Sequence, residues 1–108
     1  GDMQEQHLLQ FFLNVVEFDM NVQEACEAAY FTSYQARASF ERHEAQPGRL
    51  TIHEEVPSWV RRDLLRMGYR LDVRPKTSGP ITAIYFDWEH GTMWGGISND
   101  SDDHGIAW

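Results

Sequence analysis

The chain has 108 residues, of which 42% are hydrophobic and 24% charged, and its formal net charge is −8. That length suits one domain with a modest core, and the globular composition excludes extensive disorder. The acidic balance argues against nucleic acid as a partner, because like charges repel phosphate. No apolar run approaches the ~18 residues that a membrane span requires, so we expect no transmembrane helix.

The first predicted element is a helix over residues 7–18. Its polar residues, Gln10, Asn14 and Glu17, recur at helical spacing and share one narrow face. The rest of its circumference is apolar, and a helix that is apolar on most sides is buried on most sides. A chain of this length has little to wrap around such a helix. We infer that sequence outside this chain, or another chain, covers part of its surface.

A second, short helix is predicted from Asn21 to about Ala29. Asn21 is a favourable N-cap, and Glu24 follows three residues later, as in a capping box. Cys26 lies on this helix beside small residues and is the chain's one cysteine. An internal disulfide is therefore excluded, and a buried, inert thiol is favoured over a nucleophile.

The remainder of the chain is predicted to contain one more helix and several strands. Pro57 suits the first turn of that helix, and Gly68 suits a left-handed stop at its end. Gly91 suits the turn of a hairpin near the C-terminal end. The predicted elements are a weak strand over 39–42, a turn at 47–48, a strand over 50–54, a helix over 57–67, and strands over 69–73, 81–88 and 92–98.

This order of elements predicts an α+β fold. The sheet is expected to be mainly antiparallel, with helices packed on one face and the opposite face bare. No internal repeat or linker divides the chain, so residues 1–108 are treated as one unit of sequence.

The first 31 residues resemble one known family in the order of their motifs. Gly-Asp-Met-Gln-Glu-Gln at positions 1–6 is similar to the Gly-Gly-Asp-x-Gln-Pro-Gln segment of the γ-glutamyltranspeptidase family, entered at its second glycine. The helix-turn-helix that follows matches without a gap, and a less specific resemblance continues to Trp108. The matching positions of the helix-turn-helix are Gln10, Asn14, Phe18, Met20, Asn21, Gln23, Glu24 and Ala25.

The resemblance implies that residues 1–108 are a single C-terminal fragment of a small subunit. The family folds as an N-terminal-nucleophile hydrolase, an αββα sandwich, and cleaves itself into two subunits. The freed N-terminal threonine attacks a γ-glutamyl amide, and the acyl-enzyme passes to water or an amino acid. That threonine would lie upstream of Gly1, so we expect an active parent enzyme and an inactive isolated chain. The resemblance also implies a periplasmic or extracellular compartment, which the sequence itself leaves open.

Two residues of this chain correspond to site positions of the family. Gly1 matches the second of two glycines whose backbone N–H groups form an oxyanion hole, and Asp2 is the neighbour that would position it. The alternative interpretation of Gly1 is a cloning remnant or a disordered terminus. No cofactor or metal is implied, because residues 53–55 lack zinc-protease spacing and residues 100–105 lack the final glutamate of a calcium loop.

Three departures from the family pattern bear on the substrate. Tyr30 replaces the arginine of an Ala-Pro-Arg-Phe motif, Ser101 that of an Asp-Pro-Arg motif, and Asp19 replaces a turn glycine. Loss of both arginines removes two buried ion pairs or carboxylate anchors. The pattern favours a divergent branch that acts on another γ-glutamyl or acyl amide.

A second hypothesis is a non-catalytic α+β interaction domain that oligomerises through its apolar first helix, since large apolar patches rarely stay exposed. The two hypotheses imply different partners. The first requires the large subunit and the N-terminal part of the small subunit, whereas the second requires further copies of this chain.

Overall fold

The computed structural model describes residues 2–40 and 42–99. These residues form two compact units. The first contains residues 2–7 and 29–78, and the second contains residues 8–28 and 79–99. Within the described residues, no helix is both long and apolar enough to cross a bilayer.

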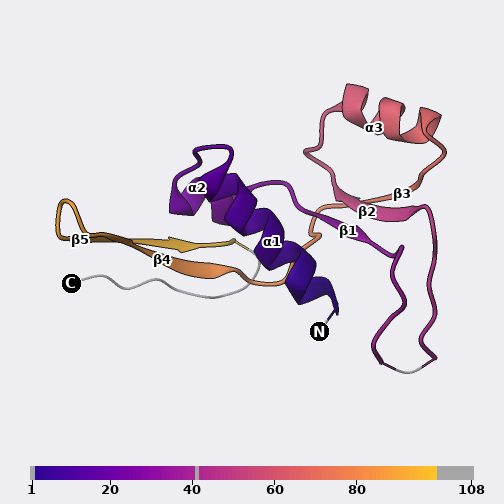
Figure 1. The fold of residues 1–108 in the computed structure, drawn as a ribbon. Helices are drawn as coiled ribbons and strands as arrows, with labels where there is room; N and C mark the ends of the chain where they lie inside the picture. Colours follow the sequence, from indigo (N-terminus) through magenta and orange to yellow (C-terminus); the bar gives the residue numbers. More distant parts are fainter. Residues whose placement is uncertain (1, 41, 100–108) are drawn as a thin grey trace. The chain divides into compact units, whose positions relative to one another are not determined.

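The first unit is a three-stranded sheet with one crossover helix (Figure 1). Its strands are β1 (Phe31–Ser33), β2 (Arg49–His53) and β3 (Arg70–Arg74), in the order β1-β2-β3, and helix α3 (Ser58–Arg66) connects β2 to β3. β1 and β2 are antiparallel, whereas β2 and β3 are parallel. A parallel pair needs a long crossover connection, which α3 supplies.

The predicted stop after α3 at Gly68 is confirmed, whereas Pro57, which was predicted in the first turn, directly precedes the helix. Pro57 is its N-cap residue, and Gly68 after its last turn has φ +93°, in the left-handed region that glycine enters at little cost. Gly48 of the predicted turn also has a positive φ, of +76°.

The strand predicted over 39–42 is wrong, and β1 was not predicted. Ser39, Phe40 and Arg42 belong to a loop between β1 and β2. The backbone N–H of Ser39 donates to Asp2 in helix α1 (Asp2–Val16), and Ala38 N–H donates to Glu44 O within the loop. These groups therefore serve the loop and α1 instead of a strand ladder.

The second unit packs a short helix on a β-hairpin (Figure 1). Helix α2 (Val22–Glu27) has the predicted capping box: Asn21 Oδ1 accepts from Glu24 N–H, and Glu24 Oε2 accepts from Asn21 N–H, both at 2.9 Å. The hairpin consists of β4 (Thr82–Asp87) and β5 (Thr92–Ile97), which are antiparallel, and Gly91 turns at φ +64°. Two of the three described strand pairs are thus antiparallel, which confirms the predicted α+β class.

Close approach of α2 to β5 depends on a glycine. A Cβ atom added at Gly96 would lie 2.5 Å from Val22 Cγ1 and 2.7 Å from the Val22 carbonyl oxygen. The contact is reinforced by Gln23, whose amide donates to Ile97 O at 2.9 Å and accepts from Ile97 N–H at 3.0 Å.

Asp19, between α1 and α2, stands where the family pattern has a turn glycine and has a positive φ. Its φ is +53°, in the left-handed region that non-glycine residues rarely adopt. Aspartate is among the residues that tolerate this conformation best.

Helix α1 (Asp2–Val16) carries most of its apolar residues on the exposed side. Leu9 and Phe12 are 59% and 58% exposed, whereas the polar residues Gln10 and Asn14 are half-buried on the opposite side with buried His7. The exposed apolar side of α1 comprises Leu8, Leu9, Phe12, Leu13 and Val16. The sequence predicted that part of this helix would be covered only by residues outside this chain. In the structure this side of α1 is uncovered.

The hairpin has a second uncovered apolar surface. Ile84, Phe86, Trp88 and Met93 share the side opposite the α2 contact, and Trp88 is 86% exposed. The buried hydrophobic core of the described residues is correspondingly small and comprises Val22, Ala25, Cys26, Tyr30, Ile52 and Ile81.

Candidate functional site at the start of helix α1

Asp2 opens α1 and ties its first turn to the loop after β1. An aspartate in a first turn is favoured by the partial positive charge at a helix N-terminus. Its Oδ2 accepts a hydrogen bond of 2.7 Å from Ser39 N–H. Hydrogen bonds from the side chain and backbone of Ser39 hold the pKa of Asp2 below its usual value. Asp2 is therefore an ionised anchor at neutral pH.

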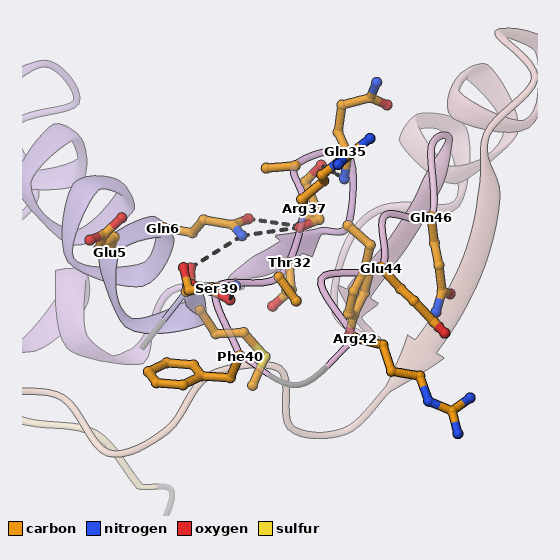
Figure 2. Close-up of a pocket in the computed structure, with 16 residues that line it drawn as sticks. Glu5, Gln6, Thr32, Gln35, Arg37, Ser39, Phe40, Arg42, Glu44 and Gln46 are labelled. Atoms are coloured by element: carbon orange, nitrogen blue, oxygen red, sulfur yellow. Dashed lines mark hydrogen bonds between the residues drawn. The ribbon is translucent and has the colours of Figure 1, made fainter.

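Gln6 makes a second connection one helical turn later. Its side-chain Oε1 accepts from Ser33 N–H at 2.8 Å, and its Nε2 donates to Ser33 O at 3.0 Å (Figure 2). The same Nε2 lies 3.5 Å from the carbonyl oxygen of Asp2. One amide thus links the first turn of α1 to the edge of β1.

His7 makes a third connection, inside the unit. It is 6% exposed, and its Nε2 lies 2.9 Å from Thr32 Oγ1. The Thr32 hydroxyl donates its one hydrogen to Thr77 O at 3.3 Å, so it must accept from His7. This network assigns the proton of the neutral imidazole to Nε2, and burial lowers the pKa of His7.

His7 and Thr32 are residue types that can serve as a base and a nucleophile, but Thr32 is not accessible to a substrate. Thr32 is 2% exposed, and its hydroxyl hydrogen is directed to a carbonyl. Thr77 in turn donates to Tyr30 O at 2.7 Å. A nucleophile must reach substrate, so this buried chain of hydrogen bonds fixes structure and performs no acyl chemistry.

A groove of about 990 Å³ lies between the first turn of α1 and residues 32–46 (Figure 2). Asp2 and Gln6 line it from the helix, and Arg37, Arg42 and Glu44 line it from the loop. Within the described residues neither arginine forms an ion pair or hydrogen bond. The groove has polar and apolar lining residues, and its charged side chains carry both signs.

The remaining sequence candidates have separate outcomes. Gly1, residues 100–105, Ser101 and Trp108 lie outside the described residues. The buried thiol is confirmed, because Cys26 is 2% exposed and burial raises its pKa. Among the described residues, no group of three His, Cys, Asp or Glu side chains is placed to hold a metal ion.

Tyr30, which stands where the family has an arginine, is a core residue. It is 2% exposed, and its ring meets that of His7 edge-on with centroids 5.9 Å apart. At this position the chain therefore has a buried aromatic ring in place of a cation.

The roles of Gln6 and His7 were missed by sequence reasoning. Their partners, Ser33 and Thr32, lie 27 and 25 residues away. No local pattern reports such a pair. The one available signal was that both are polar residues directly before the apolar run that begins at Leu8.

Comparison with known proteins finds similarity in structure. No protein-family model matches the sequence, and no curated protein matches it significantly. An acivicin-inhibited γ-glutamyltranspeptidase matches at 24% identity and a TM-score of 0.72, over 92% of this chain and 48% of its own. The Helicobacter pylori γ-glutamyltranspeptidase T380A mutant matches at 21% identity and a TM-score of 0.67, over 90% of this chain and 48% of its own.

A cephalosporin acylase from Bacillus halodurans matches this entire chain at 23% identity and a TM-score of 0.82, over 18% of its own length. The chain thus spans about half the length of the γ-glutamyltranspeptidase chains that it matches. These matches confirm the resemblance to γ-glutamyltranspeptidases at the level of the fold, together with the predicted N-terminal-nucleophile hydrolase class of fold.

Proposed function

We propose that this chain is the C-terminal part of the small subunit of a γ-glutamyltranspeptidase-like enzyme. The parent would cleave a γ-glutamyl or related acyl amide through an acyl-enzyme on an N-terminal threonine upstream of Gly1. The observation that carries this proposal is that residues 2–6, Asp-Met-Gln-Glu-Gln, form the start of α1 in a chain that shares its fold with transpeptidases and an acylase.

Within the parent, Gly1 would donate a backbone N–H to the oxyanion, and Asp2 would hold that peptide in place. Glycine suits the first role because no side chain blocks the approach of substrate. The bond between Asp2 and Ser39 N–H supports the second role, since it fixes the residue that follows Gly1. Asp2→Ala in the parent should lower kcat by about tenfold, because loosely held groups lose catalytic geometry.

The rest of the parent would cover the two uncovered apolar surfaces. These are the exposed side of α1 and the side of the hairpin that bears Trp88. Contiguous apolar surface of this kind marks an interaction site. The matched chains extend well beyond the aligned part, which is consistent with a larger protein that supplies the cover.

The decisive experiment is a turnover assay with two preparations, the 108-residue chain and the full-length parent. A γ-glutamyl anilide and a simple acyl anilide serve as parallel substrates. Both are needed because Tyr30 stands where the family pattern has an arginine, so the acyl group that the parent accepts is open. We expect turnover by the parent and none by the isolated chain. Turnover by the isolated chain would contradict the proposal, since the nucleophile would then lie within it.

A non-catalytic interaction domain is the second candidate, and the exposed side of α1 is the observation that favours it. Leu9 and Phe12 there could pack against a second copy of α1. Analytical ultracentrifugation of the isolated chain and of Phe12→Glu would show an oligomer that dissociates in the variant. A wild-type chain that stays monomeric at high concentration would exclude self-association.

A further inference from the structure

The edge of β1 presents a pair of backbone groups that the sheet itself does not satisfy. Tyr34 N–H donates to Arg49 O, and His53 N–H donates to Tyr30 O, on either side of Ser33. Hydrogen-bonded and non-bonded pairs alternate along an antiparallel ladder, so Ser33, opposite Leu50, directs its N–H and C=O away from β2. An exposed edge of this kind is normally capped.

Gln6 caps this edge with one side-chain amide. Its oxygen and nitrogen meet Ser33 N–H and Ser33 O at 2.8 and 3.0 Å, the complementary pair that a neighbouring strand would provide (Figure 2). An amide is the side-chain group that supplies a donor and an acceptor side by side. A carboxylate could keep the bond to Ser33 N–H but would face Ser33 O without a proton to donate.

The cap lies one turn from Asp2, and both residues are tied to the same stretch of chain. Gln6 binds Ser33, Asp2 binds Ser39 N–H, and His7 binds Thr32 behind them. The first turn of α1 is thus held at both ends, which fixes its rotation about the helix axis and its height along β1. A helix tied only at Asp2 could pivot about that bond.

We propose that Gln6 is a positioning residue that sets the orientation of the Asp2 peptide, and through it of Gly1, for acyl transfer. The inference rests on the proposed function and adds to it a residue that does not touch substrate. Loss of the amide should displace the oxyanion donor without removing it. Misplacement by about 1 Å can cost up to ~100-fold in rate, and we expect a fall in kcat of about tenfold with KM within twofold.

The test uses the full-length parent and three variants. Gln6→Glu keeps the acceptor but loses the donor, and Gln6→Met loses both. Gln23→Glu is the matched control, because Gln23 forms the same kind of amide pair with Ile97 in the other unit. For each variant, kcat and KM are measured from pH 7.5 to 4.5, with Tm and circular dichroism as controls for folding.

The pH profile distinguishes positioning from a general loss of stability. A protonated glutamate regains an O–H donor, and an ordinary glutamate titrates near pH ~4.3. The ratio of kcat for Gln6→Glu to kcat for wild type should rise toward one as the pH falls, whereas the ratio for Gln6→Met should stay low throughout. Gln23→Glu should keep wild-type kcat even where its Tm is lower. If Gln6→Met does not fold, the Gln6→Glu profile decides the outcome.

Two results would overturn this inference and leave the proposed function standing. The first is an unchanged kcat in Gln6→Glu. The second is a loss of kcat in both Gln6→Glu and Gln23→Glu that is proportional to the loss of Tm in each. Absence of acyl-amide turnover by the wild-type parent would instead overturn the proposed function, and this inference with it. The wild-type rate and the variant ratios therefore report the two failures separately.

Discussion

Substitution of Gly96 by alanine should destabilise the second unit by forcing α2 away from β5. The added Cβ would lie 2.7 Å from the Val22 carbonyl oxygen and 2.8 Å from its carbonyl carbon. Ordinary contacts are about 3.5 Å, so the start of α2 must retreat by about 0.8 Å. Both atoms belong to the backbone, and no change of side-chain rotamer can relieve the clash.

The magnitude follows from two costs. Overpacking of a close contact costs about 1–3 kcal/mol. The retreat also stretches the Gln23–Ile97 pair, now 2.9 and 3.0 Å long, beyond hydrogen-bond length. Each such bond contributes about 1 kcal/mol. Together these costs give a loss of about 3–5 kcal/mol in the free energy of unfolding. At about 4–8 °C per kcal/mol, this loss lowers Tm by about 12–40 °C in a domain of this size.

Gly95 is a neighbouring control in the same strand. A Cβ added there meets nothing within 4 Å, and neither glycine has a left-handed φ that would exclude alanine. Gly95→Ala should therefore leave Tm unchanged or raise it slightly. Thermal melts by circular dichroism at matched protein concentration compare the two variants with wild type. Equal Tm values for Gly96→Ala and Gly95→Ala would refute the close-approach argument.

Four further outcomes are expected. Asn21→Ala should cost about 1 kcal/mol in unfolding free energy through loss of the capping box, while Asn21→Asp should cost little; urea titration checks both. Asp19→Gly should raise stability by about 0.5–1 kcal/mol, because φ +53° is strained for aspartate, and an unchanged urea midpoint would contradict this. Because the pKa of His7 is lower in the folded state, the contribution of neutral His7 to stability is fully present above its unfolded pKa near 6.5 and is lost as the pH falls through the folded pKa. Tm should therefore drop between pH 7 and 5 in wild type, and it should drop less in His7→Gln. Cys26 should react with a thiol reagent only on unfolding, so fast labelling of the folded chain would show that it is accessible.

The features that could be predicted from the sequence are those whose causes are local. The capping box of Asn21 and Glu24, the stop at Gly68 and the turn at Gly91 each depend on a few consecutive residues, and all three occur in the structure. The hairpin was predictable for the same reason, because its strands are joined by a short turn.

The features that were missed depend on partners distant in sequence. β1 has three residues and exists because β2 and Gln6 satisfy its backbone on either side. The parallel pairing of β2 with β3 follows from the path of α3, which periodicity does not report. Of the candidate site, the sequence indicated Asp2, but the loop residues that hold it became visible only in three dimensions.

The outward-facing apolar side of α1 also has a consequence for how the stability of this chain should be measured. Any species that covers Leu9 and Phe12 binds the folded form and draws the folding equilibrium toward it. The Tm of the isolated chain should therefore rise with protein concentration if copies associate. It should rise further when the remainder of the parent is added in trans. A single Tm then reports stability at one composition of the sample. Only Tm values measured over a series of protein concentrations report the stability of the isolated chain.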